Sequence, residues 1–523
     1  MTNDLALGFD DGAARHDSRP LDLLRSPAQA ALWLRQRVTG TLCADSRTIE
    51  PGDGLLAWPG AHSDARTHVR DALAAGARAC LVETQGLEAF DFGPSAMDSI
   101  ASYAGLKQAA GPIASAYFEQ PSAKLDMLAI TGTNGKTSTA WWLAQALSDA
   151  ALARPGPCAV VGTLGIGRPP HVQSSGLTSP DPVLLHKSLR ALQVDGCSAC
   201  AIEASSVGLA ERRLDGLLIK VAVFTNFTQD HLDYHGSMQA YWQAKAELFR
   251  WPGLVAAVVN IDDAKGQELA ADLAGTGIDL WTYSALGEAR LRASAVQHGA
   301  PGLNFTVSEG AQSLPLHTAL AGQFNVSNLL AVLGSMRALG IPLEAALQAC
   351  TALQSVPGRM EWVSERYQPL AVVDYAHTPD ALEKALAGLR PLATQRGGAL
   401  WCVFGCGGNR DASKRPLMAA AAAKGADHIV LTSDNPRMED PQAILDQVLQ
   451  GFTPAQRGRL QVRSQRDQAI LQTILNAAPA DVVLIAGKGH EDYQEIRGQR
   501  LPFSDREQAR QALRKRALQG RTP

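Results

Sequence analysis

The segment Thr131-Gly-Thr-Asn-Gly-Lys-Thr-Ser-Thr139 combines glycine, lysine and hydroxyl side chains at a spacing that suits phosphate binding. The glycines let backbone N–H groups approach phosphate oxygens closely. Lys136 is expected to reach the β- and γ-phosphates of a nucleotide, and the Thr137 hydroxyl is expected to ligate Mg²⁺. Two residues separate Gly132 from Gly135, whereas the common form of this loop has four.

A strand and a helix must position this loop. The apolar run Leu125-Asp-Met-Leu-Ala-Ile130 predicts a buried strand before it, and Ala140-Trp-Trp-Leu-Ala-Gln-Ala-Leu147 predicts a helix after it. The N-terminus of that helix would add partial positive charge beside the phosphates. A glycine-rich turn that arose by chance is the alternative, but the lysine, the hydroxyl and both elements stand where phosphate binding needs them.

Two further polar segments follow strand candidates. Glu203 comes directly after the apolar residues 199–202, so it would lie at the carboxyl edge of a sheet, where a carboxylate can ligate Mg²⁺. Residues 225–236 hold two histidines and two aspartates after another strand, and His231 is the metal-ligand candidate. A strand-end glutamate that faces water is the alternative for Glu203, but the phosphate loop favours the metal role.

Length and composition restrict the class of protein. A chain of 523 residues is too long for one hydrophobic core, so we expect three domains. A hydrophobic content of 46% with 19% charged residues is typical of a globular protein. A net charge of −3 argues against a nucleic-acid partner. The acidic N-terminus lacks a signal-peptide pattern, and no apolar run approaches the roughly 20 residues of a membrane span. We therefore expect a cytoplasmic protein and a monomer.

The eight cysteines show no disulfide framework. Cys197 and Cys200 form a lone C-x-x-C that runs into an apolar strand, and Cys402 and Cys406 flank another strand. Buried free thiols are expected in preference to a zinc or redox site.

Strand and helix patterns divide the chain into residues 1–123, 124–356 and 357–523. The first block opens with a polar tail of disordered composition and then alternates short strands and helices. The second block has strand candidates at 159–161, 199–202, 221–224 and 255–260, and the third at 370–374, 400–404, 428–431 and 482–486. The predicted fold class is α/β with three domains. The central domain would be a P-loop ATPase-like parallel sheet, and the C-terminal domain a Rossmann-like doubly wound sheet.

Together these motifs resemble the Mur ligase family over nearly the whole chain. Gly322-Gln-Phe-Asn-Val-Ser-Asn328, Val356-Pro-Gly-Arg-Met-Glu361 and Val373-Asp-Tyr-Ala-His-Thr-Pro-Asp380 are similar to segments that surround the adenine, a hinge and the ATP phosphates in that family. The resemblance implies ATP binding by Gly132, Thr133, Asn134, Gly135, Lys136, Thr137, Ser138, Asn325 and Arg359. Pro357-Gly358 lies between two patterned blocks and predicts a hinge at residues 356–359.

The C-terminal segments resemble a narrower group within the family. Phe404-Gly-Cys-Gly-Gly-Asn-Arg410, Asp434-Asn-Pro-Arg437 and Ala486-Gly-Lys-Gly-His-Glu491 are similar to those of members that add meso-diaminopimelate to UDP-N-acetylmuramoyl-L-alanyl-D-glutamate. This reaction is the third amino-acid step of peptidoglycan precursor synthesis. The implied mechanism uses ATP to convert the substrate carboxylate to an acyl phosphate, which the amine then attacks. The implied catalytic residues are Lys136, Lys245, Glu203 and His231.

Lys245 has two interpretations. From spacing alone, a lysine on an amphipathic helix after the His/Asp cluster is a solvated surface residue. The family resemblance implies instead that Lys245 carries a carbamate derived from CO₂. With Thr137, Glu203 and His231, that carbamate would ligate Mg²⁺.

The resemblance also implies two substrate sites. The UDP-muramoyl-dipeptide site is expected in two parts. The residues expected near its uridine diphosphate are Ala44, Ser46, Ala61, His62 and Ser63, and those expected near its muramoyl-dipeptide part are Thr178, Ser179, Ser205, Glu211 and Arg213. The residues expected near diaminopimelate are Arg410, Asp434, Asn435, Pro436, Arg437, Gly487 and Glu491. A planar guanidinium suits a carboxylate, which favours substrate contacts for Arg213 and Arg437.

Two of these assignments have structural alternatives. Thr178 and Ser179 could instead cap a helix, and Arg437 could instead pair with Glu439 or Asp440.

Three other functions compete with this interpretation. An L-lysine-adding ligase and a folylpolyglutamate synthetase would share the ATP site. A nucleotide-gated regulatory protein would share the loop but show no amino-acid dependence. Diaminopimelate-dependent release of ADP would distinguish the proposed ligase from all three.

Overall fold

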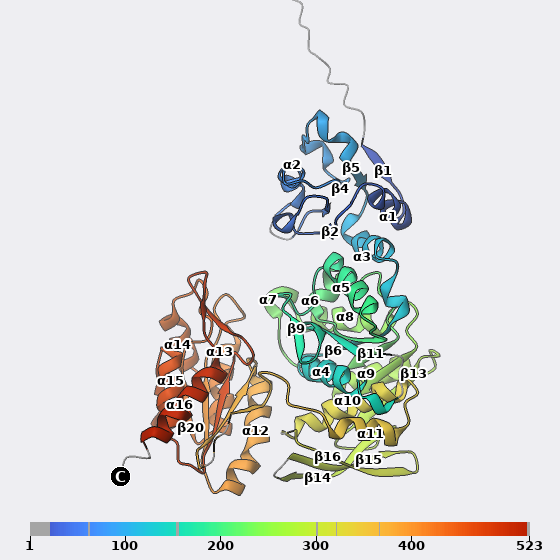
Figure 1. Ribbon diagram of the computed structural model, residues 1–523. Coiled ribbons are helices and arrows are strands. Elements are labelled where there is room, and N and C mark those ends of the chain that lie inside the picture. The colour runs from blue at the N-terminus through green and yellow to red at the C-terminus, as the bar shows by residue number, and fades with distance from the viewer. Residues whose placement is uncertain are drawn as a thin grey trace, which may run out of the picture. The chain divides into compact units, whose positions relative to one another are not determined.

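The computed structural model describes residues 21–60, 63–152, 156–299, 302–320, 322–363, 365 and 367–519 (Figure 1). The chain divides into two compact units, Met1–Glu119 with Asp181–Lys187 and Gln120–Pro180 with Ser188–Pro523. The tail expected to be disordered lies outside the described residues. No described helix is long and apolar enough to cross a membrane. The domain boundaries expected near residues 123 and 356 stay predictions.

The first unit holds a parallel sheet in the order β1-β5-β4-β3-β2. Adjacent residues of a strand face opposite sides, so Leu56 packs with α1 and α3 while Leu55 packs with α2. Glu83 ends β4 and accepts hydrogen bonds from the N–H groups of Gly105 and Leu106 at the start of α3. Its elements are β1 Asp22–Leu24, α1 Pro27–Arg35, β2 Leu42–Cys43, β3 Gly54–Ala57, α2 Val69–Ala74, β4 Ala79–Glu83, β5 Ile100–Tyr103 and α3 Leu106–Tyr117.

The second unit opens with an eleven-stranded sheet in the order β16-β15-β14-β13-β12-β11-β6-β10-β7-β8-β9. Its strands are β6 Asp126–Thr131, β7 Cys158–Gly162, β8 Gly165–Arg168, β9 His171–Gln173, β10 Ala199–Glu203, β11 Val221–Phe224, β12 Ala256–Asn260, β13 Asp279–Ser284, β14 Leu291–Gly299, β15 Gly302–Glu309 and β16 Gln312–Thr318. Strands β14, β13, β12, β11, β6, β10 and β7 pair in parallel. The expected parallel sheet is therefore confirmed at its centre. Antiparallel strands extend both edges, and the sequence patterns did not predict them.

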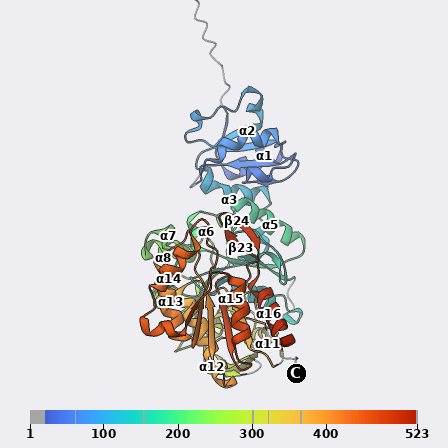
Figure 2. The same cartoon turned by 90° about the vertical axis from the view of Figure 1, so that its left-hand side faces the viewer.

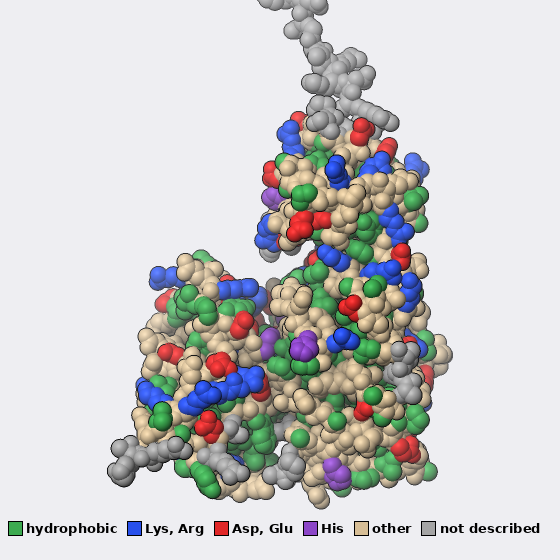
Figure 3. Space-filling model, viewed as in Figure 1, with side chains coloured by type: hydrophobic (Ala, Val, Ile, Leu, Met, Phe, Trp, Pro, Cys, Tyr) green, Lys and Arg blue, Asp and Glu red, His purple; other side chains and the backbone are tan. Residues whose placement is uncertain are grey.

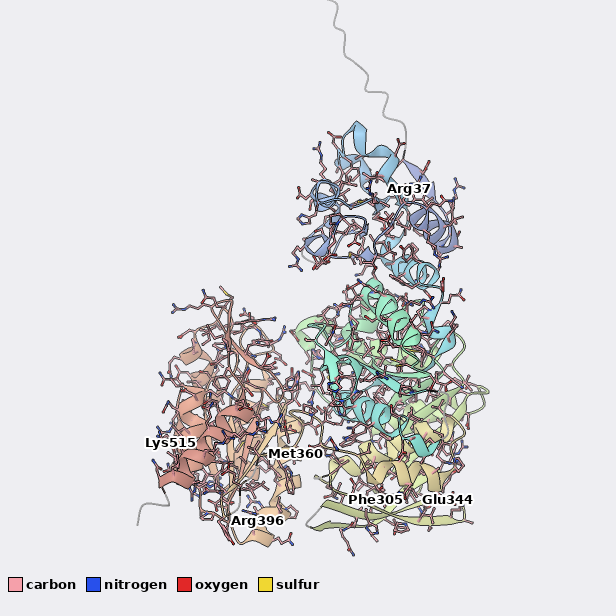
Figure 4. All side chains as sticks on the ribbon, viewed as in Figure 1. Arg37, Phe305, Glu344, Met360, Arg396 and Lys515 are labelled. Carbon is pink, nitrogen blue, oxygen red and sulfur yellow. The ribbon has the colours of Figure 1, made fainter. Side chains whose placement is uncertain are left out.

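Helices α4, α10 and α11 cover one face of this sheet, and Trp142, Leu330 and Leu347 contribute to their shared core. Phe305 of β15 belongs to the same core, whereas Glu344 of α11 accepts a hydrogen bond from the Gln312 side chain of β16 (Figure 4). The helices of this part are α4 Lys136–Ala146, α5 Pro182–Val194, α6 Ser206–Ala210, α7 Leu232–His235, α8 Met238–Ala246, α9 Ala264–Leu273, α10 Phe324–Ala338 and α11 Leu343–Thr351.

A six-stranded sheet in the order β17-β18-β22-β19-β20-β21 follows, parallel except for β17. Helices α12, α13 and α14 share one core with it, which includes Met360 (Figure 4), and α15 and α16 share the other (Figure 2). Helices on both faces confirm the expected doubly wound arrangement. Its elements are β17 Glu361–Val363, β18 Leu370–Asp374, α12 Pro379–Arg396, β19 Leu400–Phe404, α13 Lys414–Gly425, β20 His428–Leu431, α14 Pro441–Leu449, β21 Leu460–Val462, α15 Arg466–Asn476, β22 Val482–Ala486, β23 Tyr493–Ile496, β24 Gln499–Pro502 and α16 Asp505–Gln519.

The cysteines agree with the expectation of free thiols. The eight cysteines are free thiols, and all except Cys43 are buried. Basic and acidic side chains are interspersed over the described residues of the face in Figure 3.

Candidate active site

The glycine-rich loop joins β6 to α4, as the sequence predicts. Gly132 has φ +142°, and a Cβ there would lie 1.9 Å from the Thr225 hydroxyl oxygen. Gly135 has φ +87°, and a Cβ there would lie 2.4 Å from the Asn328 side-chain oxygen. Both positions therefore require glycine for conformation and for space.

This loop lines a pocket with residues from several strand ends. The lining residues are Thr133, Asn134, Gly135, Lys136, Thr137, Ser138, Thr163, Thr178, Glu203, Ser205, Ser206, Asp230, His231, Lys245, Arg359, Tyr375 and His377. The four residues expected to be catalytic, Lys136, Lys245, Glu203 and His231, are thus brought together. Thr163, Asp230 and His377 also line the pocket, but the sequence analysis did not predict them as site residues. The position of Thr163 directly after β7, at the carboxyl edge of the sheet, could have identified it.

Two lysines share one backbone acceptor in this pocket. Lys136 Nζ donates to the carbonyls of Gly132 at 2.9 Å and Thr133 at 2.8 Å, and Lys245 Nζ donates to Gly132 O at 2.8 Å. Lys245 is buried on α8, so the surface position inferred from spacing is wrong. Burial lowers the pKa of both lysines, and the Lys136 ammonium lowers the pKa of Lys245 further.

Glu203 ends β10 with its carboxylate buried beside the helix that follows the loop. Its Oε2 accepts the Thr137 hydroxyl at 2.9 Å, and its Oε1 accepts the Thr163 N–H at 2.8 Å. A Cβ on Gly162 would lie 2.2 Å from Oε1. The carboxylate is therefore held in one orientation, toward Thr137.

His231 lies just before α7 with φ +52°. Its Nε2 is 3.5 Å from Asp230 Oδ2, and His377 Nε2 is 4.0 Å from the same oxygen. Burial lowers the pKa of His231, which favours the neutral imidazole that binds metals. Among the described residues, no three His, Cys, Asp or Glu side chains gather into a metal site.

Arg359 approaches the pocket from the segment expected to be a hinge. Its Nη2 donates to Thr137 Oγ1 at 3.1 Å, and its guanidinium lies 4.4 Å from the Tyr375 ring centre. Its Nε is buried and has no hydrogen-bond partner among the described residues. Gly358 has φ +66°, and a Cβ there would lie 2.0 Å from His490 N. The hinge motion itself stays a prediction.

Asn134, Ser138 and Asn325 complete the predicted nucleotide-binding residues. Asn134 lies in the loop, and its Nδ2 donates to Asp380 Oδ2 at 2.9 Å. Ser138 lines the pocket, whereas Asn325 does not. Asn325 instead accepts a hydrogen bond from Asn328, the residue that packs on Gly135.

The residues expected near the muramoyl-dipeptide form a hydrogen-bonded group beside Glu203. Ser179 Oγ donates to Glu203 O at 2.8 Å and lies 2.9 Å from Ser205 Oγ. Arg213 Nη1 donates to Ser179 O at 3.0 Å. Thr178 Oγ1 lies 3.1 Å from the Thr163 hydroxyl.

The helix-cap alternative for Thr178 and Ser179 is wrong. Asp181 Oδ1 accepts the first free N–H groups of α5, those of Val183 and Leu184. Glu211 accepts a hydrogen bond from the Tyr234 hydroxyl.

The residues expected near uridine diphosphate lie in the first unit. Ala44 precedes Asp45, whose Oδ1 accepts the Arg47 N–H and caps the short 3₁₀ turn that begins at Ser46. Ser63 O accepts the Gly60 N–H at 2.8 Å. Ala61 and His62 lie outside the described residues.

Two loops of the six-stranded sheet bring the predicted diaminopimelate residues other than Arg410 together. Residues 434–437 follow β20, and residues 487–491 follow β22. Asn435 Nδ2 donates to Glu491 Oε2 at 2.8 Å. Gly487 has φ +119°, and a Cβ there would lie 2.4 Å from Asp434 Oδ2. Lys488, which the sequence analysis missed, is buried and donates to both Asn435 Oδ1 and Glu491 Oε2.

Arg437 makes different contacts from the alternative that the sequence left open. Its Nη1 donates to Gly408 O at 2.8 Å, and its Nε lies 3.9 Å from Glu495 Oε2. Glu439 instead pairs with Arg415, so the alternative pairing of Arg437 with Glu439 or Asp440 is wrong. Pro436 precedes Arg437, and Arg410 is exposed on the loop after β19.

Comparison with known proteins agrees with these motifs. The family model for the Mur ligase middle domain matches residues 130–336, and that for the Mur ligase, glutamate ligase domain matches residues 358–489. A relative from Acidovorax sp. (strain JS42), named UDP-N-acetylmuramoyl-L-alanyl-D-glutamate–2,6-diaminopimelate ligase, is 58% identical over 95% of this chain and 99% of its own length.

Solved structures give the same result. One with that ligase name has a TM-score of 0.63 and 35% identity, and the match covers 91% of this chain and 95% of the other. The MurF ligase from Thermotoga maritima in complex with ADP has a TM-score of 0.64 over 92% of this chain and 99% of the other, and its 16% identity shows likeness of fold alone. The chain therefore belongs to the Mur ligase family of ATP-dependent amide ligases.

Proposed function

We propose that this chain joins meso-diaminopimelate to UDP-N-acetylmuramoyl-L-alanyl-D-glutamate, with conversion of ATP to ADP and phosphate, in peptidoglycan precursor synthesis. The main support is the pocket that combines the phosphate loop with Lys245 and Glu203. The 58% identity to a relative named as this ligase supports the substrate assignment. Use of ATP as co-substrate fits a cytoplasmic location.

The chemistry requires an activated carboxyl group, because a carboxylate is a poor electrophile. Transfer of the γ-phosphoryl group gives an acyl phosphate and ADP; the amine then attacks the carbonyl, and phosphate leaves from the tetrahedral intermediate. Lys136 would exchange its two backbone carbonyl partners for phosphate oxygens. Arg359, whose Nε has no hydrogen-bond partner among the described residues, would add a second cation. Both groups would stabilise charge that grows in the transition state.

The side chains present fit Mg²⁺. Thr137 and Glu203 provide hard oxygen ligands 2.9 Å apart, and His231 lines the same pocket. The bound ion would supply neutralisation of phosphate charge. Glu203 is oriented by the Thr163 N–H, so its carboxylate is ready to act as a ligand.

Lys245 fits the proposed carbamate. In the unmodified protein, Lys136 and Lys245 direct two ammonium groups at one carbonyl, that of Gly132. Reaction with CO₂ requires a neutral amine, which the lowered pKa of Lys245 favours. The product would remove a like charge and provide an anionic oxygen ligand.

The distal end of meso-diaminopimelate carries a carboxylate and an ammonium, so it needs a cation and an anion nearby. We assign Arg437 to the carboxylate, because its Nε is 3.9 Å from Glu495 and holds no close hydrogen bond there. We assign Glu491 to the ammonium, alongside Asp434, Asn435 and Gly487. Arg213 would bind a carboxylate of the muramoyl-dipeptide beside Thr178 and Ser205.

The test measures release of ADP from ATP by the purified chain with UDP-muramoyl-dipeptide and either meso-diaminopimelate or L-lysine. We expect release of ADP when the amino acid is meso-diaminopimelate and no release when it is L-lysine. Arg437→Lys should raise the KM for diaminopimelate and leave the KM for the nucleotide precursor nearly unchanged, because a lysine lacks the bidentate fork. Equal use of lysine would contradict the substrate assignment. ADP release without amino-acid dependence would contradict the ligase itself.

A further inference from the structure

A buried guanidinium lies between the two loops that carry the proposed diaminopimelate residues. Arg466 begins α15, Asp505 begins α16, and neither side chain is exposed. Arg466 Nε donates to Asp505 Oδ1 and Nη2 donates to Oδ2, both at 2.7 Å. This bidentate contact fixes the plane of the guanidinium group.

The remaining donors of Arg466 point at the origins of both loops. Nη2 donates to Ala486 O at 2.9 Å, and Nη1 donates to Ser433 O at 3.4 Å. Ala486 directly precedes Gly487, and Ser433 directly precedes Asp434. One planar group therefore ties the carboxyl ends of β20 and β22 to each other and, through Asp505, to α16.

The packing around this group is tight. A Cβ on Gly487 would lie 2.4 Å from Asp434 Oδ2 and 3.9 Å from Arg466 Nη2. Burial alone would raise the pKa of Asp434, but the charges of Arg466 and Lys488 outweigh it and lower that pKa. The guanidinium thus helps to keep a buried carboxylate ionised at the edge of the proposed amino-acid site.

Stability alone does not account for this pair. Replacement of a buried ion pair by apolar side chains of similar volume is often neutral or stabilising. Apolar side chains could not donate hydrogen bonds to the carbonyls of Ser433 and Ala486, which Arg466 binds. We therefore explain the ion pair by the two loops that Arg466 holds in place through these carbonyls.

We propose that Arg466 and Asp505 are positioning residues for the amino-acid substrate, an inference that rests on the proposed function. They touch no substrate, because both are fully buried. They act through the two loops, by fixing Asp434 and Gly487 relative to each other. Lysine at 466 would keep the charge but could not contact Asp505 and both carbonyls together.

The experiment compares Arg466→Lys, Asp505→Asn and the control Asp481→Asn. Asp481 is a buried carboxylate at the opposite end of β22, where it accepts hydrogen bonds from Ala399 N and Trp401 Nε1, both at 2.8 Å. The measurements are the KM for diaminopimelate, the KM for UDP-muramoyl-dipeptide, kcat and the Tm.

Arg466→Lys and Asp505→Asn should each raise the KM for diaminopimelate by at least about tenfold, since a misplacement of about 1 Å can cost about a hundredfold. The KM for the nucleotide precursor should stay nearly unchanged, and Asp481→Asn should lower the Tm without changing either KM. If one of these two variants fails to fold, the KM of the other variant for diaminopimelate tests the inference.

Two results with the folded variants would overturn the inference. The first is a lower Tm with an unchanged KM for diaminopimelate, and the second is an equal rise in the KM of both substrates. Wild-type protein is assayed first: absence of diaminopimelate dependence would overturn the proposed function and this inference with it. Dependence in the wild type with an unaffected KM in the folded variants would overturn the inference alone.

Discussion

Replacement of Glu203 should separate its effect on stability from its effect on catalysis. The carboxylate is 1% exposed and accepts the Thr137 hydroxyl, the Thr163 N–H and the Thr163 hydroxyl. In Glu203→Gln, the amide oxygen can still accept the Thr163 N–H, and both hydroxyls can rotate to accept the amide N–H groups. In Glu203→Ala, the Thr163 N–H is stranded, at a cost of about 1–3 kcal/mol.

These contacts determine how much each variant should change the Tm and the kcat. Alanine should lower the Tm by about 2–4 °C for each kcal/mol lost in a domain of about 150–250 residues, whereas glutamine should change it little. Both variants should lose about a hundredfold to a thousandfold in kcat, because each removes the charge that we assign to Mg²⁺ binding beside the phosphates.

Thermal unfolding and ADP release measured on the same preparations test this reasoning. The expected order of stability is wild type and Glu203→Gln above Glu203→Ala, and the expected order of activity is wild type far above both variants. A Glu203→Gln enzyme that kept most of its activity would refute the metal-ligand assignment. A Glu203→Gln protein as unstable as the alanine variant would refute the hydrogen-bond argument.

Three further predictions concern ionisable side chains in this pocket or next to it. Lys136→Ala should fold and lose about a hundredfold to a thousandfold in ADP release; near-normal turnover would contradict its assignment to the phosphates. Lys245→Ala should be inactive and partly rescued by small carboxylic acids, and an unmodified Lys245 exposed to solvent in a nucleotide-bound structure would contradict the carbamate. Burial, with Arg359 and Lys488, lowers the pKa of His490 from 6.5 to about 3. The unfolded chain therefore binds more protons in this window, so the Tm should fall as the pH decreases from 6.5 towards 3. The fall should be shallower in His490→Gln, and an identical pH profile would argue against a buried neutral imidazole.

Much of the fold could be predicted because parallel strands that are buried on both faces are continuous apolar runs. Strands β18, β19, β20 and β22 begin and end at the predicted residues. The edge strands lack this signal. β8, Gly165–Arg168, holds two glycines and an exposed arginine, and its burial decreases along the strand. Such a strand forms because it pairs with β7. Its own residues carry no apolar pattern from which it could be predicted.

The active-site prediction depended on where each residue lies along its strand. Glu203 and the phosphate loop follow buried strands directly, so topology alone places them at one edge of the sheet. Lys245 could not be placed in this way, because an amphipathic pattern does not tell which polar residue of α8 turns toward the loop. Arg466 and Asp505 are 39 residues apart, and no local signal connects them.

The pocket gathers three cationic side chains, those of Lys136, Lys245 and Arg359. Lys136 and Lys245 share the Gly132 carbonyl, and Arg359 lies beside them with an Nε that has no hydrogen-bond partner among the described residues. Desolvated cations near each other destabilise the folded protein, and the lowered pKa values of both lysines express this cost. In the proposed nucleotide complex, the polyphosphate would replace these carbonyl dipoles with full negative charges. The same cluster of cations would therefore provide selectivity for the nucleotide in the proposed complex, because preorganised cations reorganise little when phosphates bind.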